Sequence, residues 1–309
     1  MTIRLAKAAA AVLLSTVALA ACGAVGDDQA AAGPTRTIKH AMGETKVPES
    51  PKRVIVLDTD KLDTMASLGL TPVGAAQAAE NQAWPKYLGS ALDATKPVGT
   101  LQAPNLEAIT ALKPDLILGT KFRQEQFYDK LNQIAPTVFT EKVGITWKEN
   151  LLLDADALGR KAQAEKLLAD YQTRARSLGG SDAVEVSIVR FMPTQIRMYG
   201  PESFSGIVVG DAGFGRPEPQ RLADAQDKRF GELSQENLSQ ADGDVLFYSA
   251  YGDQAAQSQA TVTGGPLWKN LPAVKDDKAH GVDDETWMLG IGVTAAGKIL
   301  DDLEKFAKP

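Results

Sequence analysis

Short apolar runs alternate with helical stripes along most of the chain. The β-branched run 53–57, which Pro51 precedes, is typical of a buried strand, and apolar residues recur at helical spacing through 61–68. The same order of strand and helix continues through residues 71–139 and resumes through residues 184–306. This alternation predicts helices packed around mostly parallel β-sheets.

The hydrophobic pattern places most elements individually. Strands are expected at residues 53–57, 71–74, 115–118, 137–139, 184–191, 195–199, 244–248 and 279–282. Helices are expected around residues 61–68, 106–112, 131–134, 233–238 and 293–306.

The segment from Trp147 to Leu178 has a different character. It contains no proline and only one internal glycine, Gly159, and its apolar positions keep a helical period until residues 179–180 end it with two glycines. As one helix it would be about 45 Å long at the usual rise per residue. We therefore expect a rigid helix that joins two lobes.

The two halves carry similar local patterns. Glu107 precedes Asp115 by eight positions in the first half, and Glu236 precedes Asp244 by eight in the second. In each case a helix with an early glutamate leads to a strand headed by aspartate. Unrelated helix–turn–strand units share such patterns, but with the long helix between the halves the repetition favours two similar lobes.

The N-terminus has the features of an export signal. Arg4 and Lys7 precede an apolar run of about a dozen residues, too short to span a bilayer, which needs roughly 20. The following Leu19-Ala-Ala-Cys22-Gly resembles the lipobox of bacterial lipoproteins, in which the signal is cut before a cysteine that carries a diacylglycerol. The alternative is an ordinary signal peptide with a chance cysteine. Residues after Cys22 are rich in glycine, alanine and polar side chains, which is typical of a flexible tether.

Composition narrows the chemistry. Without Arg4 and Lys7 the chain has 31 basic and 39 acidic side chains, a net charge of −8 that argues against nucleic acid as a partner. Its one cysteine excludes an internal disulfide, and two histidines, His40 and His280, are too few for a multi-histidine metal site. The chain lacks a G-x-S-x-G elbow, and its glycine cluster at 210–215 lacks the P-loop lysine, so we expect neither an enzyme nor a bound cofactor.

Ligands of open α/β sheets bind beyond the carboxyl ends of the strands. The residues near those ends are rich in aromatic side chains and arginine, which suit flat or anionic groups. The candidate ligand-binding residues are Trp84, Phe122, Arg123, Trp147, Arg190, Arg197, Tyr199, Phe204, Tyr251 and Trp287.

Each candidate also has a structural interpretation. Arg190 could form a buried ion pair, and Arg197 and Tyr199 could point to solvent. Trp147 could pack at the start of the long helix, and Trp84 could be ordinary packing beside Pro85.

Several segments in this order resemble one family. The resemblance is carried by Pro51-Lys-Arg-Val-Ile-Val-Leu57, the segment 68–74, Asn105-Leu-Glu-Ala-Ile109 with Lys113-Pro-Asp-Leu-Ile117, the segment 134–138 and the segment 267–274. Together they are similar to the iron-siderophore/cobalamin class of periplasmic binding proteins. Arg190-Phe191, Arg197, Tyr199-Gly200 and Ser203-Phe204 add a similarity to actinobacterial lipoproteins that bind ferric hydroxamates of the ferrioxamine type.

This resemblance implies a class III binding-protein fold, in which one long helix joins two Rossmann-like lobes around a cleft that changes little on binding. It implies a monomer anchored by lipid to the outer face of the cell membrane, with residues 1–21 as signal peptide, 22–35 as tether, 36–146 and 180–309 as lobes, and 147–179 as the joining helix. The resemblance further implies a ferric hydroxamate siderophore as ligand, with cobalamin, haem, or a citrate or catecholate siderophore as alternatives.

An ABC permease is the implied partner. Glu107 and Glu236 match the glutamates with which each lobe contacts permease arginines, although either could simply stabilise the first turn of its helix. Some hydroxamate binders have an arginine just before the segment at 105, where this chain has Leu101 and Gln102. That contact would have to come from elsewhere, such as Arg190 or Arg197.

Overall fold

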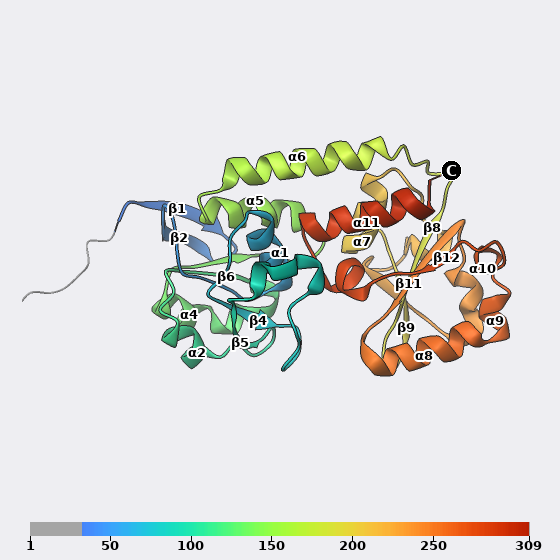
Figure 1. Cartoon of the computed structure of the whole chain (residues 1–309), viewed down its shortest axis with the longest axis horizontal. Helices are drawn as coiled ribbons and strands as arrows, with labels where there is room; N and C mark the ends of the chain where they lie inside the picture. Colours follow the sequence, from blue (N-terminus) through green and yellow to red (C-terminus); the bar gives the residue numbers. More distant parts are fainter. Residues whose placement is uncertain (1–32, 309) are drawn as a thin grey trace, which may run out of the picture. The chain divides into compact units, whose positions relative to one another are not determined.

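The computed structural model describes residues 33–308 (Figure 1). The expected signal peptide, the lipidated Cys22 and most of the tether therefore lie outside the described residues. Within the described part, no helix is long and apolar enough to cross a membrane.

The first lobe is built on a parallel sheet of five strands in the order β5-β4-β3-β6-β7. Its strands are β3 (Val54–Val56), β4 (Gly74–Gln77), β5 (Lys96–Thr100), β6 (Leu116–Thr120) and β7 (Thr137–Thr140). Its helices and turns are α1 (Thr59–Ser67), η1 (Lys86–Leu92), α2 (Leu106–Ala111), α3 (Lys121–Gln124), η2 (Glu125–Phe127) and α4 (Tyr128–Ile134). The β-branched run at 54–56 is completely buried, as its sequence predicts.

A hairpin of β1 (Thr35–His40) and β2 (Gly43–Pro48) precedes this sheet. The hydrophobic pattern does not reveal it because most of its positions are polar, and the buried apolar ones, Ile38 and Val47, are isolated. It joins the lobe through a hydrogen bond from the Ala41 amide to the Phe139 carbonyl (2.9 Å). The tether predicted to reach residue 35 therefore ends earlier, since Thr35 is already paired with Pro48.

The single long helix predicted over 147–179 is wrong in its extent. The structure has two helices, α5 (Trp147–Ala157) and α6 (Lys161–Ser177), separated at Gly159. Gly159 has φ +70°, and a Cβ there would lie 2.5 Å from the Glu49 carbonyl. Arg36 fixes the break by donating to the carbonyls of Asp156 and Ala157 (both 2.9 Å).

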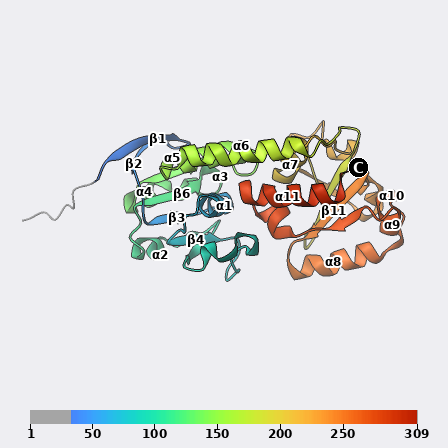
Figure 2. The same cartoon turned by 45° about the horizontal axis from the view of Figure 1, so that its top comes forward.

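Only α6 runs between the lobes, about 25 Å in length, whereas α5 packs on the first lobe (Figures 1 and 2). The joining element is thus about half as long as expected, and the two-lobe fold is kept because α6 alone is long enough to reach both sheets.

The second lobe has a mixed sheet in the order β10-β9-β8-β11-β12. Its strands are β8 (Val186–Phe191), β9 (Ile196–Tyr199), β10 (Phe230–Leu233), β11 (Val245–Ala250) and β12 (Ala279–Gly281). Strands β8, β11 and β12 are parallel, while β9 and β10 form antiparallel additions at one edge.

Around this sheet lie five α-helices and three other helical turns. They are α7 (Phe204–Asp211), η3 (Glu218–Gln220), η4 (Gln235–Ala241), α8 (Gly252–Gly264), α9 (Pro266–Lys269), α10 (Pro272–Lys275), the π-helical turn η5 (Glu285–Leu289) and α11 (Val293–Phe306). The predicted helix at 293–306 is confirmed. The helix predicted at 233–238 is wrong, because Leu233 ends β10 and a 3₁₀ turn follows, and the glycine cluster read as a loop begins inside α7.

The repeated glutamate–aspartate pattern has a structural basis at its aspartates. Asp115 accepts from the backbone amides of Lys52 and Arg53 (2.7 and 2.9 Å), just before β3. Asp244 accepts from the Glu185 amide (2.8 Å), just before β8. Because β6 lies beside β3 as β11 lies beside β8, each aspartate fixes the start of its neighbouring strand at the same place in its lobe.

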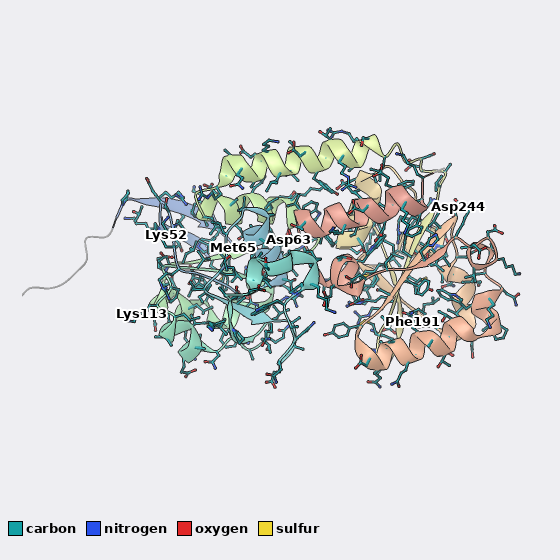
Figure 3. The ribbon with its side chains drawn as sticks, in the orientation of Figure 1. Lys52, Asp63, Met65, Lys113, Phe191 and Asp244 are labelled. Carbon is teal, nitrogen blue, oxygen red and sulfur yellow. The ribbon has the colours of Figure 1, made fainter. Side chains whose placement is uncertain are left out.

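A buried carboxylate fastens the two lobes together away from α6. Asp63 of α1 accepts from the backbone amides of Thr294 and Ala295 at the start of α11 (both 3.0 Å) and from the hydroxyl of Tyr87 (3.2 Å) (Figure 3). A Cβ on Gly292 would lie 2.4 Å from this carboxyl group, so the close approach requires glycine there. We call these contacts the Asp63 latch.

Candidate ligand-binding groove

Two adjoining hollows lie between the lobes and form one groove. They measure about 250 and 230 Å³ and share Val143, Ile145, Glu202 and Arg229 in their walls. The first lobe contributes Phe122, Arg123 and residues 142–145 to what we call the interlobe groove. The second lobe contributes Arg197, Tyr199, Glu202, Ser203, Phe204, Ser205, Gln226, Asp227, Arg229, Phe230, Trp287, Met288 and Ile291.

The strand ends account for only part of this lining. Phe122 and Arg123 follow β6 directly, and Trp287 lies in the turn after β12, as the rule for open sheets predicts. Phe230 enters from the opposite end of its strand, because β10 runs antiparallel to β9. The antiparallel edge therefore brings residues to the groove that a purely parallel sheet would keep away from it.

Arg197 forms no ion pair with a carboxylate among the described residues, although Glu232 lies opposite it on β10. Its guanidinium lies over the Phe230 ring, 4.1 Å from the centroid. The Gln195 side-chain amide makes all its hydrogen bonds when its oxygen faces Arg197. The oxygen then accepts from Nε (2.6 Å) and Nη2 (2.5 Å) of Arg197, and the amide nitrogen donates to Glu232. Arg197 is therefore held by a neutral group, and its charge remains available to a bound anion.

Arg229 and Asp227 form a second charged feature of the groove. Arg229 donates from Nε and Nη2 to both carboxylate oxygens of Asp227, at 2.7–3.1 Å. These hydrogen bonds lower the pKa of Asp227. The Arg229 guanidinium also faces Phe122 of the first lobe at 6.0 Å, and the Phe122 side chain, 57% exposed, forms the rim.

Arg190 forms the buried ion pair that was the alternative to a ligand contact. Its Nε and Nη2 donate to the two oxygens of Asp284 (2.7 and 2.5 Å), and Nη1 donates to the Tyr199 hydroxyl (3.3 Å). Its guanidinium also lies 4.8 Å from the Tyr251 ring centroid. Neither Arg190 nor Tyr251 lines the groove, so the structure favours a supporting role for both beneath Tyr199.

The tryptophans separate in the same way. Trp147 is buried between Tyr171 and Phe204, edge-to-face with each at 5.1 and 5.6 Å, and it belongs to the core. Trp287 is also buried and donates from its indole nitrogen to Asp302 (2.8 Å), but it forms part of the groove wall, as Phe204 does.

Trp84 lies elsewhere, in a smaller hollow with Gln77, Glu285 and Leu289. This hollow is lined by the first and last residues of η5, Glu285 and Leu289, whereas Trp287 and Met288 between them face the groove. Trp84 is therefore not brought together with the arginines, and Arg123, Arg197, Tyr199, Phe204, Phe122 and Trp287 are the predicted site residues that the groove unites.

Sequence reasoning missed several groove residues. They are Lys142, Glu202, Gln226, Asp227, Arg229, Phe230 and Met288. Most lie in connecting segments or in β10, where charged residues are ordinary, so no local pattern distinguishes them. The basic pair Lys228-Arg229 directly before Phe230 was the one available signal.

Neither histidine lies in the groove. His40 contacts Thr45 within the hairpin through Nε2 (2.9 Å), and His280 stacks on Phe306 with ring centroids 4.0 Å apart. The oxygen-bearing groups that do line the groove belong to Tyr199, Glu202 and Asp227, beside two serines.

Comparisons with known proteins agree with this architecture. A family model described as "Periplasmic binding protein" matches residues 54–286. The chain is 39% identical over 309 residues to the probable siderophore-binding lipoprotein YfiY of Bacillus subtilis, covering 95% of each, and 31% identical to its Fe(3+)-citrate-binding protein YfmC, covering 88% of this chain and 85% of that one. The crystal structure of Staphylococcus aureus SirA with staphyloferrin B superposes with a TM-score of 0.78 at 34% identity, covering 88% of this chain and 98% of that one.

Proposed function

Because this chain belongs to the periplasmic binding protein family, we propose that it binds an anionic iron(III) chelate of the carboxylate type in the interlobe groove. The broader assignment is that it is a substrate-binding protein for a siderophore or iron chelate, serves ABC-transporter uptake and is not an enzyme. The fold is the class III binding-protein fold. The proposal concerns the chemical class of the chelate.

The uncompensated charge of Arg197 is the observation that carries the proposal. An arginine held by a neutral amide over an aromatic ring retains its attraction for an anion, and the forked guanidinium matches carboxylate oxygens. Arg123 adds a second guanidinium from the opposite wall. The names of two relatives, which bind iron citrate and staphyloferrin B, support a ligand of this kind.

A ferric hydroxamate is the second candidate, as the sequence resemblance predicted. The observation in its favour is the aromatic wall formed by Tyr199, Phe230 and Phe122, which would cover an apolar chelate. A complex with no net negative charge would gain less from Arg197, so the two candidates differ in their dependence on that residue.

Delivery to the permease would use one glutamate on each lobe. Glu107 lies in the first turn of α2 and Glu236 in the first turn of η4, and both side chains are exposed. These positions support the proposal that permease arginines contact them. Lipidation at Cys22, attachment to the outer face of the membrane and a monomeric state complete the proposed arrangement.

Titration of intrinsic fluorescence with ferric citrate and ferrioxamine B tests the ligand class. Trp287 in the groove wall should be quenched by ferric citrate at low concentration and much less by ferrioxamine B, with free tryptophan as the control for absorption by iron. The opposite order would favour the hydroxamate. If neither complex binds saturably, the proposed function is refuted.

A further inference from the structure

A carboxylate that does not line the groove holds one of the groove's arginines. Asp58 follows β3 and is fully buried. Its Oδ1 accepts from the Thr59 amide at the start of α1 (2.8 Å), and its Oδ2 accepts from Nε of Arg123 (2.9 Å). One oxygen of Asp58 is thus fixed to the backbone of α1, and the other is fixed to Arg123, which lines the groove.

The Asp58–Arg123 ion pair leaves the two terminal guanidinium nitrogens of Arg123 free to donate. Asp58 uses only Nε, and within residues 33–308 the two terminal nitrogens of Arg123 have no hydrogen-bond partner. Arg190 shows the contrast, because Asp284 takes both Nε and Nη2, and Tyr199 takes Nη1. The same type of ion pair therefore occupies one arginine completely and merely anchors the other.

We propose that Asp58 is a positioning residue for ligand binding, which grips Arg123 by Nε and aims its two terminal nitrogens across the interlobe groove at the anionic part of the chelate. The inference rests on the proposed function, since it concerns the same groove. Preorganisation is the physical reason, because a long side chain fixed before binding loses less conformational freedom when the ligand arrives.

A buried charge cluster keeps this anchor in place. Lys61 donates to Asp60 (2.9 Å) and to the Thr140 hydroxyl (2.8 Å), and it pairs with Asp154 (3.0 Å), all fully buried. Burial raises the pKa of Asp58 and the charge of Asp60 adds to that rise, whereas the charges of Arg123 and, more weakly, Lys61 oppose it. The ionised form of Asp58 therefore depends mainly on Arg123, and the cluster contributes by tying the first turn of α1, which Asp58 caps, to Thr140 of β7 and Asp154 of α5.

Affinity measurements on four proteins test the inference. We expect Asp58→Asn to weaken ferric citrate binding about tenfold, Arg123→Ala to weaken it at least as much, and the double variant to bind like Arg123→Ala alone. A loss of equal size from Asp58→Asn in both backgrounds, or no loss at all, would overturn it. Asp115→Asn is the matched control, because Asp115 accepts from backbone amides at the opposite end of the same strand and should change stability without changing affinity.

The conservative variant Arg123→Lys gives a second check that leaves Asp58 intact. Lysine has a single nitrogen in place of the three of arginine, so it cannot pair with Asp58 and reach across the groove at once. Its ammonium group should pair with Asp58 and withdraw from the groove. Ferric citrate should then bind as weakly as it does to Arg123→Ala. Binding at the wild-type level would overturn the role of the open guanidinium.

Nuclear magnetic resonance of arginine side chains separates this inference from the proposed function. In the unliganded full chain, the Nε–H signal of Arg123, assigned by its absence in Arg123→Ala, should exchange slowly with water and become fast in Asp58→Asn. An unprotected signal in the wild type would overturn the anchor. If neither ferric citrate nor ferrioxamine B binds, the proposed function fails and the positioning role falls with it, whereas a protected signal would still establish the anchored geometry.

Discussion

Replacing Asp63 by alanine should sharply destabilise the protein, because the Asp63 latch is one of the few polar attachments between the lobes. The change removes the acceptor of two buried backbone amides, those of Thr294 and Ala295, and of the Tyr87 hydroxyl. Each buried donor left unpaired costs about 1–3 kcal/mol. The lost attraction between the carboxylate and the start of α11 costs about 0.3–1 kcal/mol more.

We therefore expect Asp63→Ala to lower the free energy of unfolding by at least about 3 kcal/mol, the lower end of these contributions, against a total of roughly 5–15 kcal/mol for a folded domain. Asp63→Asn keeps the shape and one acceptor but turns an amide donor toward the α11 amides, so about half that loss is expected. Urea unfolding followed by both fluorescence and circular dichroism measures the change and shows whether the lobes still unfold together.

Asp170→Ala is the matched control for this experiment. Asp170 is also a helical aspartate, but it forms an exposed pair with Lys166, which is worth at most about 0.5 kcal/mol. A loss below about 1 kcal/mol for Asp63→Ala would refute the reasoning, because it would mean that water replaces the carboxylate or that the lobes do not depend on this attachment.

Three further outcomes are expected. Arg197→Ala should weaken ferric citrate binding at least tenfold by isothermal titration calorimetry, while Arg176→Ala, an exposed arginine on α6, should leave it unchanged; equal effects would exclude a specific contact. Burial raises the pKa of Asp154 from 3.8 to about 7, so between these two pH values the folded state holds this proton and the unfolded state does not. The free energy of unfolding should therefore fall as pH rises through this range, by up to about 1.4 kcal/mol per pH unit. Asp154→Asn should remove this part of the pH dependence of urea unfolding between pH 5 and 8, and an unchanged dependence would contradict the prediction. Combined Glu107→Ala and Glu236→Ala should abolish iron uptake in cells while ferric citrate affinity stays at the wild-type level, and lost affinity would mean that the glutamates are misassigned.

The hydrophobic periodicity was enough to predict an element where each of its faces has one environment along its whole length. The run 54–56 is buried on both faces and reads as continuous β-branched residues, and α11 shows a clear apolar stripe that ends where the helix ends. It failed at Gly159, because helical period continues on both sides of the break and the cause is remote. Arg36 and Glu49, more than a hundred residues away, meet the chain there.

The composition of the groove was harder to predict for a related reason. The strand-end rule brought in Phe122 and Arg123 but not Arg229, which precedes the start of β10, where β10 pairs with the end of the antiparallel β9. Trp147 and Trp287 each follow a threonine in sequence and both are buried in the same core, and tertiary packing alone decides that Trp287 also lines the groove.

The arginines show most clearly what decides a binding role. Arg190, Arg123 and Arg197 all follow or occupy strands near the interlobe region, so position does not separate them. They differ in how many donors the protein already uses and in the charge of the acceptor. Asp284 and Tyr199 occupy three nitrogens of Arg190, the neutral Gln195 amide occupies two of Arg197, and Asp58 occupies one of Arg123. Because Asp284 and Asp58 lie 94 and 65 positions from their arginines, this difference is created by folding, and it predicts that sensitivity to an anionic ligand follows the number of donors left open.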